Sequence, residues 1–131
     1  MKLSTRSRYG TRMVLDLAKR FDEGPVRIGD IAEREGISVK YLEQLIILLK
    51  QADFIRSVRG PKGGHMLSRP PENITVGEVV KVLEGGMNLT VCVENPEKCE
   101  KSMDCVTRDV WEAASKAMYD KLDSMTLAGL L

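Results

Sequence analysis

Three cysteines lie close together in a chain that contains no other cysteine: Cys92, Cys99 and Cys105. An odd number of thiols at short spacing cannot form a closed set of disulfides, whereas thiolates are good ligands for iron–sulfur clusters and zinc. We therefore expect this segment to bind a metal centre or to respond to oxidation through the thiols themselves.

The 131 residues suffice for one domain with a modest core, and the two halves of the chain carry opposite charge. Residues 1–70 contain 14 Lys and Arg against 8 Asp and Glu, whereas residues 71–131 contain 6 against 11. A basic half suits a polyanion, because cations that displace phosphate counterions supply most non-specific affinity for nucleic acid. We expect the acidic half to face away from that partner. Ordinary scatter of surface charge is the alternative.

No stretch reaches the ~18 uninterrupted apolar residues of a membrane helix, and the N-terminus lacks the apolar core of a signal peptide. We expect a cytoplasmic protein with no membrane partner, in which thiols stay reduced. That environment favours metal binding or redox sensing over a disulfide framework.

The N-terminal third has the pattern of a helix-turn-helix. Apolar residues recur every four positions from Tyr9 to Phe21 and predict a first helix that ends near Glu23–Pro25. A short helix over 28–36 follows, and Ser38 is placed to cap a third helix. Two short helices joined by a turn with glycine are typical of a helix-turn-helix, whose second helix enters the major groove. A generic helical hairpin is the alternative.

Three outward positions near the start of this third helix are candidate DNA contacts: Lys40, Glu43 and Gln44. The carboxylate of Glu43 is repelled by phosphate and only accepts hydrogen bonds, so in a groove it can select the amino group of cytosine and reject other sequences. A solvated surface charge is the alternative interpretation of Glu43.

A two-stranded wing is predicted next. Residues 54–59 and 65–68 are strand-like, and the segment Gly60–Gly64 between them is a dense turn signal. Arg59 and Lys62 flank the tip, where a narrow minor groove would attract an inserted guanidinium.

The C-terminal half combines a capped helix, the cysteine loop and a long helix. Thr75 and Glu78 form a capping box that opens a helix ending at Gly85–Gly86. The loop then covers roughly 87–105, and the longest helical pattern of the chain covers roughly 106–125. Because the preceding residues can form their own core, this helix needs a partner for its apolar stripe. We predict a homodimer; a helix folded back on its own domain is the alternative.

These elements predict a mainly α fold with a small β-wing. A winged helix-turn-helix DNA-binding domain would cover residues 1–71, and a helix, the cysteine loop and the dimerisation helix would cover 72–131. The chain has no Gly-rich phosphate loop and no paired-carboxylate motif, and its single histidine, His65, lies far along the chain from the cysteines. We therefore predict that it is not an enzyme. A winged helix that binds another polypeptide is a further alternative, against which the basic half argues.

The chain resembles the winged-helix regulators of the IscR, NsrR and CymR family over nearly its whole length. The stretches that carry the resemblance are Arg8-Tyr9, Asp30–Ala32, Gly36–Ser38, Tyr41–Leu45, Val58–Gly64, Thr75–Val79 and the cysteine loop. The resemblance implies homodimers that bind palindromic promoter sites in double-stranded DNA. It also implies that Lys40, Glu43 and Gln44 read the major groove and that Arg59 enters the minor groove.

The cysteine loop is most similar to the IscR branch, whose members hold a 2Fe–2S cluster with three cysteines and one histidine. The resemblance implies that Cys92, Cys99 and Cys105 hold such a cluster and that it modulates DNA binding. The position expected for the histidine is Arg108, which cannot ligate because it stays protonated.

The fourth ligand is therefore open, and an incomplete protein ligand set predicts a labile cluster. Exogenous thiol, water or a nearby carboxylate could complete it, the carboxylates being Glu94, Glu97, Glu100, Asp104 and Asp109. Arg8 stands near the place where the nitric-oxide-sensing branch uses an acidic ligand from the partner subunit. A cluster-free thiol switch or cysteine-metabolism regulator of the same fold is the alternative function, and zinc is a third option for the loop.

Overall fold

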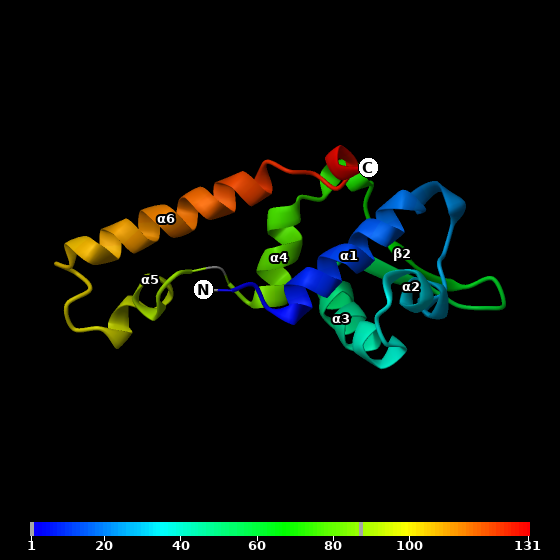
Figure 1. Cartoon of the computed structure of the whole chain (residues 1–131), viewed down its shortest axis with the longest axis horizontal. Coiled ribbons are helices and arrows are strands. Elements are labelled where there is room, and N and C mark those ends of the chain that lie inside the picture. The colour runs from blue at the N-terminus through cyan, green and yellow to red at the C-terminus, as the bar shows by residue number, and fades with distance from the viewer. Residues whose placement is uncertain (1, 87) are drawn as a thin grey trace.

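The computed structural model describes residues 2–86 and 88–131, which form several helices and one small sheet that extends from one end of the molecule (Figure 1). The helices are α1 (Thr5–Lys19), α2 (Ile28–Glu35), α3 (Val39–Gln51), α4 (Val76–Glu84), α5 (Val91–Glu94) and α6 (Val106–Asp123), and the strands are β1 (Ile55–Val58) and β2 (Gly64–Leu67). Short 3₁₀ turns occupy Phe21–Glu23, Pro71–Asn73, Pro96–Lys98 and Ala128–Leu130. The predicted mainly α architecture with a β-wing is confirmed.

The ends of the central helices follow from local capping. The Ser38 hydroxyl accepts a hydrogen bond from the Tyr41 N–H at 3.1 Å, as predicted for the start of α3. Thr75 and Glu78 form the predicted capping box of α4, with bonds of 3.0 and 2.8 Å. Gly36 ends α2 in the left-handed conformation, which glycine adopts without steric cost.

One hydrophobic core joins α1, α2, α3, the base of the wing and α4. Its largest fully buried side chains are Met13, Leu17, Ile31, Leu42, Leu45, Leu49, Leu67, Ile74, Leu83 and Leu127. Residues from both sides of the Pro70-Pro71 linker therefore share this core. The division into 1–71 and 72–131 stays a prediction about the roles of the two halves.

Asp16 on α1 is the one buried charged residue in the described part of the chain, with its side chain 2% exposed. Arg34 of α2 donates to its two carboxylate oxygens, at 2.9 Å from Nε and 2.8 Å from Nη2. Arg20 Nη1 lies 3.5 Å from the same carboxylate. A carboxylate is stable in an apolar interior only when it is paired, so this ion pair joins α2 to α1 in one orientation.

The first turns of α1 are held against the last turn of α4. A Cβ on Gly10 would lie 2.3 Å from a methyl carbon of Leu83, so only glycine fits without movement. Glu84 accepts hydrogen bonds from the Ser4 N–H at 2.7 Å and from the Ser7 hydroxyl at 2.6 Å. These bonds join residues near the N-terminus to the helix that precedes the cysteine loop.

The hydrogen bond from the Ser7 hydroxyl lowers the pKa of Glu84 below its ordinary value of 4.5. A carboxyl whose folded pKa is lowered contributes stability above its unfolded pKa. That contribution is lost as the pH falls through the folded value. The contact between α1 and α4 is therefore complete at neutral pH.

α6 projects away from the core and is anchored at its C-terminal end (Figure 1). Val76 and Val80 of α4 pack against three residues of α6, Met118, Tyr119 and Leu122, and against Met125 in the turn after it. The chain then returns to the core, where the Leu127 N–H donates to the Ile74 carbonyl at 2.9 Å. The N-terminal part of α6 carries the cysteine loop at the far end of the molecule.

A substitution at Gly77 tests how closely α6 packs against α4. A Cβ at Gly77 would lie 2.2 Å from Oδ1 and 2.9 Å from the backbone nitrogen of Asp123, so Gly77→Ala must push α4 and α6 apart. We predict that it lowers the free energy of unfolding by about 1–3 kcal/mol. Gly29→Ala in α2 is the control, because no atom lies within 4 Å and alanine is the better helix former. Denaturant unfolding measures both variants, and equal stabilities would contradict the close packing.

Candidate nucleic-acid interface and cysteine loop

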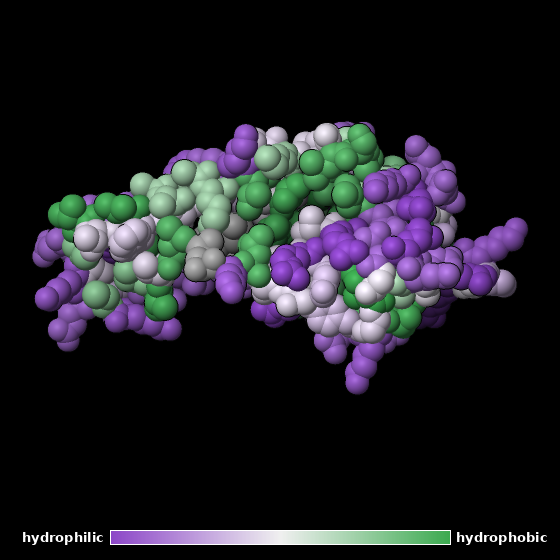
Figure 2. Space-filling model, in the orientation of Figure 1, coloured by the Kyte–Doolittle hydropathy of each residue, from purple (hydrophilic) through white to green (hydrophobic). Residues whose placement is uncertain are grey.

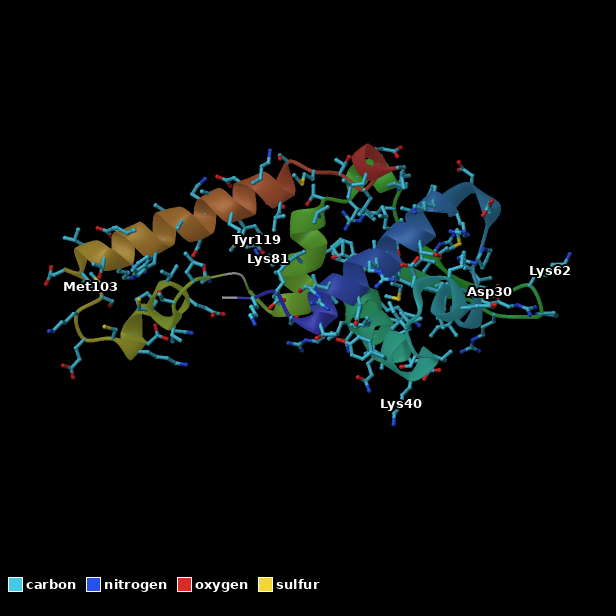
Figure 3. The ribbon with its side chains drawn as sticks, in the orientation of Figure 1. Asp30, Lys40, Lys62, Lys81, Met103 and Tyr119 are labelled. Atoms are coloured by element: carbon cyan, nitrogen blue, oxygen red, sulfur yellow. The ribbon has the colours of Figure 1, made fainter. Side chains whose placement is uncertain are left out.

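The outer face of α3 presents the three predicted contact residues. Lys40, Glu43 and Gln44 are all exposed, because the opposite face of the helix is buried in the core through Leu42, Leu45, Ile46 and Leu49. Figure 3 shows Lys40 pointing away from the body of the molecule. This face can therefore approach the edges of bases in a major groove.

Ile47 extends the same face and was missed in the sequence. It is 56% exposed, one helical turn after Glu43 and Gln44. An exposed apolar side chain at that place suits the methyl group of thymine. Its spacing from Glu43 is the signal that could have identified it.

The wing carries its two predicted cations at the outer end. β1 and β2 pair antiparallel from Ile55 opposite Leu67 to Val58 opposite Gly64. The pair Ile55 and Leu67 is buried at the base, whereas Arg59 and Lys62 are exposed at the turn. Figure 3 shows Lys62 at the tip of the wing. The ribbon thus presents positive charge at its end, as predicted.

His65 belongs to the ribbon. Its Nδ1 lies 3.0 Å from the Ser57 hydroxyl on the opposite strand. Burial, with a smaller effect of the charge on Lys50, lowers the pKa of His65 below 6.5. The neutral imidazole therefore serves the pairing of the two strands.

The segment around the cysteines contains two short helical pieces that the sequence pattern did not predict, α5 and the turn Pro96–Lys98. Four and three residues are too few to show a helical period, which explains the omission. Cys92 lies half-buried in α5, Cys99 is exposed after the turn, and Cys105 is the N-cap residue of α6.

The thiols suit a soft metal centre in type but are not gathered in this arrangement. Within residues 2–86 and 88–131, no three His, Cys, Asp or Glu side chains are grouped so that they could hold one metal ion. The Thr107 hydroxyl and the Arg108 backbone N–H lower the pKa of Cys105, which favours the thiolate that metals require. The donor set fits an iron–sulfur cluster, and ligation by all three thiols requires the segment between Cys92 and Cys105 to rearrange.

The oxygen donors considered for a fourth ligand all lie at the surface: Glu94, Glu97, Glu100, Asp104 and Asp109. Arg108 has a different role from the ligand expected at its position. Its Nε donates to the Cys92 carbonyl at 3.0 Å and its Nη1 lies 3.3 Å from Glu112. Arg108 therefore joins α5 to α6. This contact could not be predicted from the local sequence pattern, because its two residues are far apart in the chain.

No helix in the described part of the chain combines the length and the apolar character needed to cross a bilayer.

Comparisons with known proteins agree with this architecture. A family model named Rrf2, described as an iron-dependent transcriptional regulator, matches residues 3–131. The chain is 51% identical to Protein rrf2 of Nitratidesulfovibrio vulgaris, over 100% of this chain and 87% of that one. The solved structure of T. potens IscR superposes with a TM-score of 0.80 at 42% identity, covering 99% of this chain and 85% of the other. CymR (YrzC), the global cysteine regulator of B. subtilis, gives 0.81 at 36% identity, covering 99% and 95%.

The proteins that share this arrangement of helices and wing regulate transcription. The chain is therefore a winged-helix DNA-binding regulator and not an enzyme. Within that class, the chain belongs to the Rrf2 family. The resemblance to IscR and CymR regulators seen in the sequence is confirmed.

Proposed function

We propose that the protein is a homodimeric, sequence-specific regulator that binds palindromic promoter sites in the cytoplasm. In this proposal an iron–sulfur cluster of the 2Fe–2S type, held by Cys92, Cys99 and Cys105, modulates the binding. The observation that carries the proposal is the arrangement of a DNA-facing end and a thiol-bearing end on one continuous set of packed helices (Figure 1).

Direct reading of DNA is assigned to the exposed face of α3 and to the wing. Lys40, Glu43 and Gln44 can reach base edges, and a guanidinium such as Arg59 suits a narrow minor groove. Lys62 adds a phosphate contact beside it.

Dimerisation is assigned to α6. Val106, Val110 and Trp111 are 76%, 52% and 41% exposed, and Met103 just before the helix is 88% exposed. Figure 2 shows apolar side chains gathered along α6 and toward α4, whereas hydrophilic ones cover most of the region around α2 and the wing. An apolar stripe on a projecting helix needs a partner surface, and a second copy of the chain supplies one that places two recognition helices on a two-fold site.

The route from the thiols to the DNA runs through α4 and α1. When bound, a cluster would supply a centre sensitive to oxidation and to iron supply. Arg108 ties α5 to α6, the seam between α6 and α4 is apolar, and Glu84 ties α4 to the first turn of α1. A change in the order of the cysteine segment can therefore bias the position of the DNA-facing elements.

A cluster-free thiol switch is the second candidate. The separation of the three thiols and the likeness to CymR, whose solved structures include an oxidised form from Staphylococcus aureus, favour it. Zinc bound by the same thiols is a third possibility.

Variants of Arg59 and Lys62 distinguish sequence-dependent recognition of the DNA from electrostatic attraction to its phosphates. We predict that Arg59→Ala costs about 1–3 kcal/mol of binding free energy, most strongly on duplexes with AT-rich flanks. Lys62→Ala removes one cation from the same turn and should weaken all duplexes evenly, with a salt slope smaller by about one. Fluorescence anisotropy over a salt series measures both. An even loss with Arg59→Ala would mean that Arg59 contacts only phosphate.

Val110→Glu tests the dimer. A charge in the apolar stripe of α6 should yield a single-chain mass by sedimentation velocity, where the unaltered protein gives twice that mass. Ile47→Glu adds the same charge to another exposed apolar site, on α3, and should leave the dimer intact. Dimers in both variants would exclude α6 as the interface.

Protein purified without oxygen should be brown and contain about two iron and two sulfide per chain. Replacement of all three cysteines by alanine should abolish the colour and leave folding intact. Zinc without sulfide would indicate a zinc site, and a colourless protein with three titratable thiols would indicate the thiol switch. Loss of the colour in air within hours is expected for an incomplete protein ligand set.

A further inference from the structure

The wing is attached to the loop between α1 and α2. Val26 forms an antiparallel bridge with His65, and each N–H donates to the carbonyl of the other at 2.8 Å. A Cβ on Gly64 would lie 2.4 Å from the Val26 carbonyl oxygen, so the strand and the loop are in close contact. This bridge holds the outer end of β2, next to the turn, but includes no residue of the turn itself.

Arg27 reaches the turn itself. Its Nη2 donates to the Pro61 carbonyl at 2.7 Å, across 34 positions of sequence. Arg27 lines a groove beside Lys62 and Gly63 of the wing, and the groove also contains two acidic residues, Glu23 and Asp30, and two further arginines, Arg20 and Arg34. Figure 3 shows Asp30 on α2 facing the same side as the wing. The guanidinium thus lies in a groove of mixed charge and is bonded to the wing turn.

A two-stranded ribbon with four residues in each strand is only marginally stable by itself. A tether at its tip restricts the directions in which the flanking side chains can point. Because these side chains are already restricted in the free protein, less conformational entropy is lost when the protein binds DNA.

We propose that Arg27 is a positioning residue for DNA recognition, which holds the wing turn so that Arg59 is directed into the minor groove. This inference rests on the proposed role of Arg59. Arg27 acts through the Pro61 carbonyl and does not itself contact the nucleic acid.

A double-mutant cycle on the full chain tests it. The variants are Arg27→Ala, Arg59→Ala and the double variant, and the probe is one promoter duplex with an AT-rich flank, titrated over a salt series. We expect Arg27→Ala to weaken binding about tenfold, which corresponds to 1.4 kcal/mol. The salt slope should stay unchanged, and adding Arg27→Ala to Arg59→Ala should cost less than threefold more.

Additive losses with a salt slope smaller by about one would overturn the inference, because they indicate a direct phosphate contact. Wild-type affinity of Arg27→Ala would overturn it as well. If Arg59→Ala itself has no effect on this duplex, the proposed minor-groove role of Arg59 is wrong. That outcome is distinguishable from one in which Arg59→Ala weakens binding and Arg27→Ala does not.

Arg27→Gln is the matched variant, because its amide keeps an N–H donor and removes the charge. We expect it to retain more affinity than Arg27→Ala at every salt concentration. Equal losses in the two variants, together with a salt slope smaller by about one, would mean that the charge and not the tether matters. Arg27 is exposed, so both variants should melt at the temperature of the unaltered protein.

Discussion

The buried carboxylate of Asp16 is the interaction on which the DNA-facing geometry depends. Its two hydrogen bonds from Arg34 form a buried polar link between α1 and α2, to which the more exposed pair of Arg12 and Glu35 adds a second one at the surface. Breaking a buried pair by removing one partner typically costs about 3–5 kcal/mol, because the remaining charge has no solvent. Since α3 follows α2 through a tight turn at Gly36, any rotation of α2 would move the recognition face with it.

The distribution of charge and apolar surface agrees with two separate tasks. The basic half of the chain forms α1, α2, α3 and the wing, whereas the acidic half forms α4, which packs against α1 in the middle of the molecule, and α5 and α6 at the far side (Figure 1). The anchored end of α6 packs on α4, and α4 packs on α1, so contacts between packed helices connect the two sides. Packed helices shift as units, which suits the transmission of a small change over a long distance.

Much of the fold was predictable from local chemistry. Caps at Ser38 and Thr75, the glycine turn of the wing and the apolar periods of the long helices are determined by residues a few positions apart. The exposed faces of α3 and the wing followed from those periods, so Lys40, Glu43 and Arg59 could be named as candidates. The short helix α5 could not be predicted, because one turn shows no period.

The sequence by itself determined the types of chemistry: three thiols for a soft metal or for oxidation, and a positively charged winged half for a polyanion. Only the tertiary structure decided which groups meet. Arg27 with Pro61, Glu84 with Ser4, and Arg108 with Cys92 are separated by 34, 80 and 16 positions. Such contacts depend on how whole helices pack. A side chain's neighbours in the sequence set its local conformation, whereas its distant partner is set by the shape of the core.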